Sequence, residues 1–227
     1  HDIIGYLPRP NQAKMWAYQA FAHGCENMLF FRWRSMTKGA EQYCYGILDH
    51  DNEKGRKFKE VQSLINETKD YEELLRTEIE SDIAVLYDYE NIWSWKYQQQ
   101  SKEFNFNNEI MRLYAPFYKL NTNIDIIPFD RDIKKYKVLL IPVMKMIDEE
   151  FYKKVDNFVK KGGTVIFSYR TGLKNKENNI YFEKTLPGYF SEMCGIKIKE
   201  VESLQEGNEV LLEGVGDLED KKVECSV

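Results

Sequence analysis

Short apolar runs alternate with segments of helical periodicity along residues 82–203, and this alternation restricts the fold more than any other feature of the sequence. The runs are four to six residues long and rich in β-branched and aromatic side chains, at 83–87, 124–129, 138–143 and 164–169. Runs of this kind are typical of strands buried on both faces. The helical segments between them predict crossovers, as in a parallel α/β sheet.

Two crossover helices are predicted in this block. Residues 107–121 carry apolar side chains three and four positions apart, and Pro116 inside the segment predicts a kink or a break. Asp148 is the predicted N-cap of the second helix, which ends at Gly162 and Gly163. The resulting order of elements predicts a doubly wound, flavodoxin-like sheet.

Residues 88–104 are expected to form a loop with a dense aromatic cluster. The cluster consists of Trp93, Trp95, Tyr97, Phe104 and Phe106. A protein core and a subunit interface both favour aromatic side chains, so the two interpretations stay open. A further strand is expected at 196–201. The acidic tail 204–227 is expected to begin a small β-domain, in which residues 210–212 start a strand.

Residues 1–76 form a separate block. The spacing of apolar residues predicts a helix at 11–23, a buried strand at 28–31 and a long helix at 57–76. The segment 35–46 between the strand and the second helix reads as a loop. Helix, strand, loop and helix in this order are typical of a parallel α/β repeat, and the polar residues 77–81 read as a linker to the next block.

Composition excludes several classes of protein. The net charge of −5 disfavours nucleic acid and anionic membranes as partners, and no apolar run is long enough to span a bilayer. The four cysteines form no C-x-x-C pair, and the three histidines have no metal-ligand spacing. We therefore expect no metal, no cofactor, and free, mostly buried thiols in a reducing, cytoplasmic compartment. Because the chain opens at His1 without Met, we also expect a fragment or a processed product.

The end of the predicted strand carries the candidate binding residues. Phe31 and Trp33 lie at or just after its end, and Glu41 lies in the loop that follows. Aromatic rings stack on the apolar faces of sugars, and a carboxylate accepts hydrogen bonds from their hydroxyls. A core strand followed by a solvated loop explains the same residues, and composition alone favours that interpretation.

A nucleophilic cysteine is the other chemistry considered. Class I amidotransferases share the predicted doubly wound fold, and they need a cysteine on a sharp strand-to-helix turn with a histidine partner. Cys194 precedes the predicted strand rather than following one, and no histidine occurs after His50. A structural thiol is therefore the preferred interpretation of Cys194.

Several motifs, in the same order and spacing, resemble the end of the barrel of a glycoside hydrolase family 42 β-galactosidase. They are Pro8-Arg9-Pro10-Asn11-Gln12, Trp16-Ala17-Tyr18-Gln19-Ala20, Ala22-His23-Gly24, Phe30-Phe31-Arg32-Trp33-Arg34 and Gly39-Ala40-Glu41. Motifs at 88–93, 125–128, 162–165 and 169–172 resemble the middle domain of the same family. The resemblance covers residues 7–200.

The resemblance implies a (β/α)8 barrel remnant at 1–76, a flavodoxin-like trimerisation domain at 82–203 and the start of a small β-domain at 204–227. It implies a retaining hydrolase of terminal β-galactosides, a homotrimer, whose nucleophile and acid/base are both glutamates. In this family both glutamates precede the segment that the chain resembles, so the chain is expected to contain no catalytic residue.

The resemblance also assigns the binding residues. Phe31, with Trp33 near it, matches an aromatic rim of the sugar site, and Glu41 matches a glutamate that binds galactose hydroxyls. Cys44 stands where the family usually has a histidine, and a thiol is the weaker hydrogen-bond donor. This difference puts the specificity for galactose in doubt.

Two expectations concern the chain as a whole. A non-enzymatic oligomerisation module, with a passive barrel remnant, is the alternative to a glycosidase fragment. On either interpretation the apolar run 28–31 is expected to be exposed, so the fragment is expected to associate through that surface.

Overall fold

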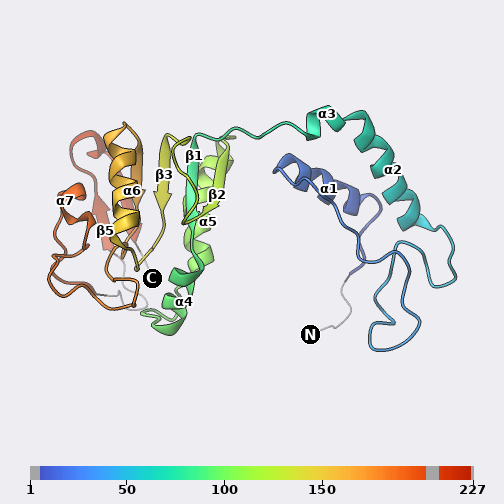
Figure 1. The fold of residues 1–227 in the computed structure, drawn as a ribbon, viewed down its shortest axis with the longest axis horizontal. Helices are drawn as coiled ribbons and strands as arrows, with labels where there is room; N and C mark the ends of the chain where they lie inside the picture. The colour runs from blue at the N-terminus through green and yellow to red at the C-terminus, as the bar shows by residue number, and fades with distance from the viewer. Residues whose placement is uncertain (1–5, 203–209, 226–227) are drawn as a thin grey trace. The chain divides into compact units, whose positions relative to one another are not determined.

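The computed structural model describes residues 6–202 and 210–225. The chain divides into two compact units, His1–Glu80 and Ser81–Val227, and the boundary falls at the predicted linker 77–81 (Figure 1). No helix in the described part of the chain has the length and apolarity needed to cross a membrane.

A four-stranded parallel sheet forms the centre of the second unit. Its strands are β1 (Ile83–Tyr87), β2 (Ile124–Pro128), β3 (Val138–Ile141) and β4 (Thr164–Phe167), in the spatial order β2-β1-β3-β4. The register pairs Val85 with both Ile126 and Leu140. All four strands were predicted, although β2, β3 and β4 each end one or two residues early.

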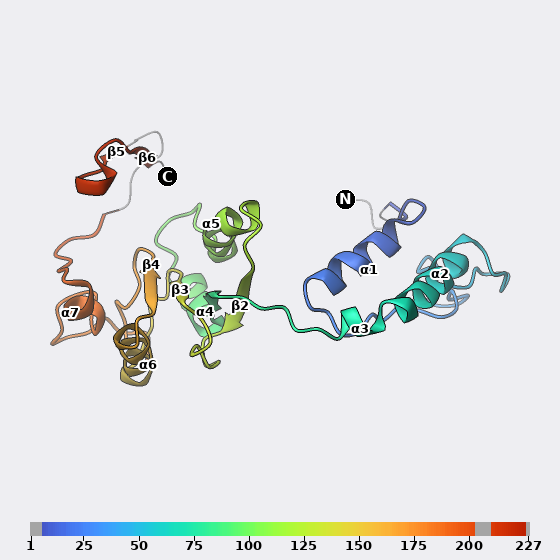
Figure 2. The same ribbon diagram turned by 90° about the horizontal axis from the view of Figure 1, so that it is seen from above.

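Helices cover both faces of this sheet (Figure 2). Because successive side chains in a strand point to opposite faces, one side of β1 and β3 packs against α4 (Tyr89–Tyr97) and α5 (Phe106–Lys119). The other side packs against α6 (Glu149–Lys160) and α7 (Phe190–Cys194). The unit is therefore a three-layer α/β/α structure.

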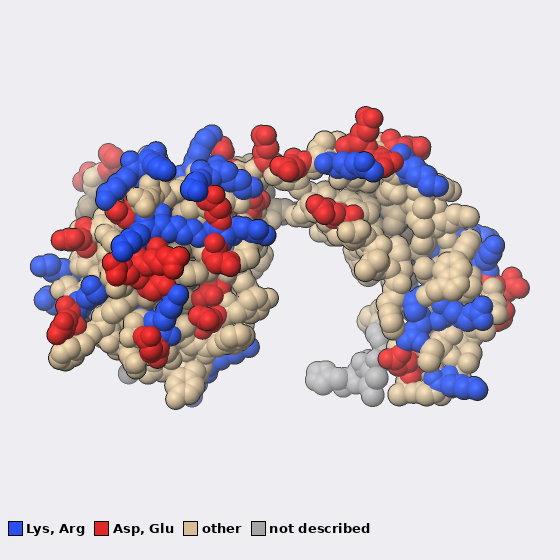
Figure 3. All heavy atoms as spheres, viewed as in Figure 1, with Lys and Arg blue, Asp and Glu red and all other residues tan. Residues whose placement is uncertain are grey.

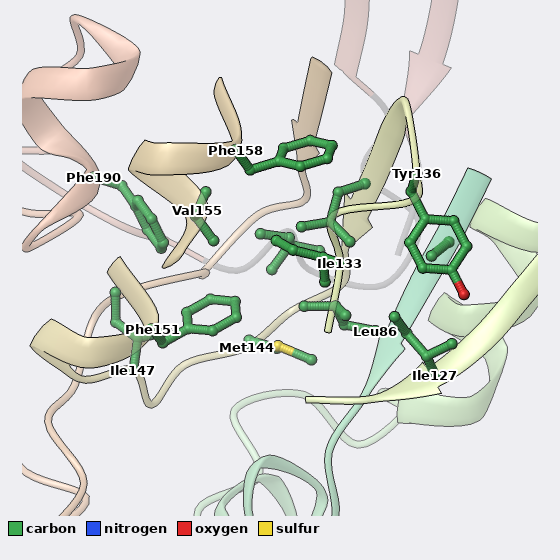
Figure 4. Close-up of a cluster of buried hydrophobic side chains, with 13 residues drawn as sticks. Leu86, Ile127, Ile133, Tyr136, Met144, Ile147, Phe151, Val155, Phe158 and Phe190 are labelled. Atoms are coloured by element: carbon green, nitrogen blue, oxygen red, sulfur yellow. The ribbon is translucent and has the colours of Figure 1, made fainter. Parts of the chain in front are cut away.

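The larger of the two cores lies beneath α6 (Figure 4). Phe151, Val155 and Phe158, one helical face, point from α6 toward Leu86 and Met144 at the sheet. The predicted N-cap of this helix is confirmed, since the Asp148 side chain accepts a hydrogen bond of 2.7 Å from the Phe151 amide. One face of α6 and the strands beneath it are buried against each other. Their apolar residues therefore recur in the sequence at the regular spacing of a helix and of buried strands.

Three predictions for the second unit are wrong. The expected loop at 88–104 contains helix α4, and its cluster is divided: Trp95 and Phe106 are buried in the core, whereas Trp93 and Tyr97 are exposed. Helix α5 continues past Pro116 to Lys119, so the break, one of the two outcomes predicted for this proline, does not occur, and the kink stays a prediction. Proline has no backbone N–H, so Pro116 costs the helix one hydrogen bond without ending it.

The predicted strand 196–201 is the third error. It is reduced to one bridge between Leu186 and Ile198, and the preceding residues form α7 instead. Beyond residue 209, β5 (Val210–Glu213) and β6 (Lys222–Cys225) form an antiparallel pair around a short 3-10 helix, η1 (Gly216–Leu218). The strand expected from residue 210 is confirmed, whereas residues 204–209 of the predicted third domain lie outside the described residues.

The first unit contains α1 (Gln12–Ala22), α2 (Arg56–Asp70) and α3 (Glu72–Leu75). The long helix predicted at 57–76 is thus two helices, separated at Tyr71. Glu67 joins α1 to α2, because it forms an ion pair with Lys14 and accepts a hydrogen bond of 3.0 Å from the Tyr18 hydroxyl. The Lys14 ammonium beside it, helped by Ser63 and Tyr18, lowers the pKa of Glu67 to about 2.

The strand predicted at 28–31 is absent from this unit. A strand needs a neighbour along its length, and the backbone pairing begins only after this segment. The Ile47 amide donates to the Arg32 carbonyl at 2.8 Å, and the Leu48 amide donates to the Trp33 carbonyl at 2.9 Å. The result is a single parallel bridge between Arg34 and Leu48.

Candidate functional site

Two extended segments, 31–35 and 46–48, form the base of the candidate site in the first unit. Ser35 joins them, since its hydroxyl donates to the Leu48 carbonyl at 2.9 Å and accepts from the Gly46 amide at 2.8 Å. Gly46 is required by this close approach: a Cβ there would lie 2.5 Å from the carbonyl carbon of Arg34. The base of the site therefore depends on one small residue and one buried hydroxyl.

The loop that carries Glu41 lies between these two segments. His50 holds its two ends, because its Nε2 lies 3.0 Å from the carbonyl oxygens of both Met36 and Gln42. The ring of Tyr45 packs edge-to-face on His50, with 5.4 Å between the ring centroids. Sequence reasoning did not identify His50, which follows the loop it holds by several residues.

Arg32 brings the two principal predicted residues together. Its guanidinium lies over the Phe31 ring, with Cζ 4.5 Å from the ring centroid, and its Nη2 forms an ion pair with Oε2 of Glu41. The peptide bond between Phe31 and Arg32 is cis. Phe31 and Glu41, ten residues from each other in sequence, are thus linked through one side chain.

A cavity of about 510 Å³ adjoins this group. Phe31 and Arg32 line it from the first extended segment, Tyr45 lines it from the end of the loop, and Val61 and Leu64 line it from α2. The described residues that line it include aromatic, aliphatic and charged side chains, a combination that suits an amphipathic ligand.

The four predicted binding residues are only partly assembled around this cavity. Phe31 lines it and is 79% exposed, whereas Trp33, Glu41 and Cys44 are not among the described residues in its lining. Trp33 packs edge-to-face on Phe58 of α2, at 6.1 Å between centroids. Glu41 and Cys44 are exposed on the loop, where the Cys44 amide donates to the Glu41 carbonyl at 2.9 Å.

This arrangement offers recognition groups. The Glu41 carboxylate accepts hydrogen bonds, and the exposed ring of Phe31 provides an apolar face. Among the described residues, no group of three or more histidine, cysteine or acidic side chains is placed to hold a metal ion.

The cysteines depart from expectation in their burial. Cys25, Cys44 and Cys194 are free, as predicted, but Cys44 is exposed and the other two are half-buried. The prediction of mostly buried thiols is therefore wrong for Cys44, which lies on a surface loop. Burial raises the pKa of the Cys194 thiol, which disfavours the nucleophilic thiolate and agrees with a structural role.

A buried cation in the second unit was not identified by sequence reasoning. Lys145 follows β3, at the carboxyl edge of the sheet, and is fully buried. Its Nζ donates to the Ser94 carbonyl at 3.2 Å and to the Gln98 carbonyl at 3.4 Å, and it lies 4.1 Å from the centroid of the Trp95 ring. It therefore caps the C-terminal turn of α4.

A second lysine reinforces that cap. Lys174 donates to the side-chain oxygens of Gln98 and Asn178 at 2.6 and 3.0 Å. Burial, with the positive charges of Lys174 and Arg170, lowers the pKa of Lys145 to about 8. In the described part of the chain these two buried lysines have no acidic partner beside them, whereas on the face of this unit that Figure 3 shows, lysine and arginine side chains are intermingled with acidic ones.

Comparison with known proteins relates both units to one kind of enzyme. A family model described as β-galactosidase matches residues 2–71, and a model described as the β-galactosidase trimerisation domain matches residues 81–226. The β-galactosidases BgaA of Clostridium cellulovorans and BgaA of Planococcus sp. are 31% and 30% identical to the chain. Each alignment covers 97% of this chain and 33% of the relative.

Solved structures agree with these matches. The crystal structure of β-galactosidase from Bacillus circulans is 30% identical and superposes with a TM-score of 0.88, over 100% of this chain and 34% of that one. The chain thus spans about a third of the length of the relatives it matches. Since the trimerisation-domain model by itself matches more than half of the sequence, the chain belongs to the glycoside hydrolase family 42 β-galactosidases.

Proposed function

We propose that this chain is the C-terminal part of a retaining β-galactosidase that hydrolyses terminal β-D-galactosides in the cytoplasm. The observation that carries the proposal is the linked group of Phe31, Arg32 and Glu41 beside a cavity, within residues that match the β-galactosidase model. In this role Glu41 accepts hydrogen bonds from sugar hydroxyls, Phe31 and Trp33 form the aromatic rim, and Cys44 lies at the edge of the site.

The two units have different roles in this proposal. Residues 1–76 are the last part of a (β/α)8 barrel, residues 82–203 a flavodoxin-like trimerisation domain, and residues 204–227 the start of a small β-domain. The parallel order β2-β1-β3-β4 supports the second assignment, since it corresponds to the first four strands of flavodoxin-like sheets. The active assembly is a homotrimer, which the match to a trimerisation domain supports.

Both catalytic carboxylates lie outside this chain in the proposed enzyme. A retaining mechanism places a nucleophile and an acid/base about 5–5.5 Å apart across the scissile bond. The chain contributes substrate binding and subunit contacts, and by itself it does not turn over substrate.

Activity measurements on two proteins test the proposal. The complete polypeptide that carries this chain is expected to hydrolyse a chromogenic β-galactoside, and NMR of the first product is expected to show the β-anomer. The 227-residue chain is expected to be inactive. Turnover by that chain well above background would contradict the placement of the catalytic groups.

The rival function is a non-enzymatic oligomerisation module with a passive barrel remnant, which the trimerisation-domain match over 81–226 favours. Galactose titration of the complete polypeptide, followed by tryptophan fluorescence, separates the two functions. Loss of affinity in Glu41→Ala supports a sugar site. Unchanged behaviour in that variant supports a scaffold.

A further inference from the structure

Arg32 occupies a position that the proposed function does not explain. It contacts both main binding residues of the proposed sugar site, through stacking on Phe31 and through the ion pair with Glu41. Its backbone is also fixed, because its carbonyl accepts the 2.8 Å hydrogen bond from the Ile47 amide. The side chain is mostly buried, with 17% of its surface exposed.

The geometry of this contact is specific to a guanidinium. Arginine is planar, so one face stacks on an aromatic ring while the nitrogen atoms in its plane donate to a carboxylate. In this structure the guanidinium carbon lies over the Phe31 ring, and Nη2 reaches Glu41. One side chain thereby sets the position of the carboxylate relative to the ring.

The electrostatic surroundings point to positioning rather than to recognition of an anion. Arg32 is paired with Glu41, and the other cations that line the cavity are paired as well, Lys14 with Glu67, Arg56 with Glu60 and Lys57 with Asp49. No net positive charge is left for an acidic sugar. A neutral sugar that donates hydroxyl hydrogens to an oriented carboxylate fits these groups better.

We propose that Arg32 is a positioning residue, which acts on sugar binding through Glu41 and Phe31 by holding both in the arrangement that binds the sugar. The inference rests on the proposed function and deepens it. Glu41 is more than half exposed, so a free carboxylate there would sample several rotamers, and substrate binding would have to select one. Because the Glu41 end of the ion pair is open to solvent, the pair contributes little to folding, and the effect belongs to ligand binding.

Steady-state kinetics of the complete polypeptide tests the inference. Arg32→Gln is expected to raise KM for a β-galactoside about tenfold while kcat changes less than twofold. The reason is that the variant binds the substrate less tightly in the ground state and in the transition state alike. Arg32→Lys retains a cation for Glu41 and is expected to recover part of that loss. Arg76→Gln is the matched control, since Arg76 also forms an ion pair with a glutamate, Glu72, in the same unit but is not among the described residues that line the cavity.

A double-mutant cycle separates positioning from an independent role. If Arg32 acts through Glu41, the double variant Arg32→Gln/Glu41→Gln has the KM of Glu41→Gln alone. Multiplicative effects of the two substitutions overturn the inference, as does a wild-type KM in Arg32→Gln. If Arg32→Gln does not fold, as judged by circular dichroism, Arg32→Met keeps the apolar stem and replaces it in the cycle.

The outcomes distinguish this inference from the proposed function. A wild-type polypeptide without activity, or an unchanged KM in Glu41→Gln, overturns the proposed function. An active wild type that responds to Glu41→Gln but not to Arg32→Gln overturns only the role of Arg32.

Discussion

Lys145 illustrates how a single residue is stabilised without a counterion. Its ammonium is fully buried and is satisfied by the carbonyl oxygens of Ser94 and Gln98 and by the face of Trp95. These carbonyls belong to the C-terminal end of α4, the negative end of the helix dipole. The sequence offers no pattern for such a site, because the cap is separated from its helix by about 50 residues.

The lowered pKa of Lys145 makes the stability of the chain depend on pH. The pKa of Lys145 is about 8 in the folded chain and 10.5 for the free side chain. Between these two pH values the unfolded state therefore binds more protons than the folded state. The contribution of Lys145 to the free energy of unfolding therefore increases as the pH rises from about 8 to 10.5. Between pH 7 and 9.5 the gain is about 2 kcal/mol, at roughly 1.4 kcal/mol per pKa unit.

Lys145→Met is expected to abolish this gain. Urea unfolding of the wild-type and variant 227-residue chains at several pH values, followed by circular dichroism, checks it. Taking the difference between the two proteins cancels the contribution of Tyr169, whose pKa burial raises to about 12. Parallel curves for the two proteins would show that Lys145 does not titrate in this window.

Cys44 gives a second prediction at the residue scale. The exposed thiol lies three residues after Glu41, across a turn, and is a weak hydrogen-bond donor. Cys44→His is expected to lower KM of the complete polypeptide for a β-galactoside severalfold, because imidazole donates a stronger hydrogen bond to a sugar hydroxyl. Cys44→Ser, which restores a small donor without the reach of imidazole, is the control. Equal KM values in all three proteins would exclude Cys44 from the site.

At the scale of elements, strands and helices that are buried on two sides were predicted from the sequence. β1 was predicted to the residue, and α6 was predicted with its N-cap Asp148. Helix α4 was missed because Tyr89, Trp93 and Tyr97 are exposed on one side, so its apolar residues follow no single face. Its N-cap was readable in principle, since Asp88 accepts from the Asn91 amide at 3.0 Å.

Asn91 links α4 to the segment that follows β3. Its buried side chain accepts from the Met146 amide at 2.8 Å and donates to the Met146 carbonyl at 3.0 Å. Asn91→Ala leaves both backbone groups without this partner, so we expect it to lower the free energy of unfolding by about 2–4 kcal/mol. Urea unfolding of the 227-residue chain measures the loss.

Glu90→Ala is the control for this substitution. Glu90 lies next to Asn91 in the same helix and is exposed, so its replacement is expected to change stability by less than about 0.5 kcal/mol. A similar loss in both variants would show that the effect of Asn91→Ala does not come from the bonds to Met146, because alanine is itself the best helix former.

At the scale of the whole molecule, the division into two units was predicted, because a polar segment interrupts two α/β patterns at 77–81. The residue types of the candidate site were predicted from the sequence, but the ion pair that links Arg32 to Glu41 was not. Arg32 was visible within the motif around Phe31, yet nothing in the sequence indicates that it pairs with a glutamate nine positions later. Loop geometry decides that pairing, and the loop has no periodic pattern.

The exposed apolar segment of the first unit gives the last prediction. Leu29 is 91% exposed and Phe31 is 79% exposed on a segment without the predicted strand pairing. Exposed apolar surface of this kind favours association, so sedimentation velocity of the 227-residue chain is expected to show species larger than a trimer as concentration rises. Leu29→Glu is expected to remove these species and leave the trimer proposed for the second unit. Leu74→Glu replaces an exposed leucine on α3 of the same unit, and it is expected to leave them in place. Identical sedimentation of wild type and Leu29→Glu would show that the segment takes no part in association.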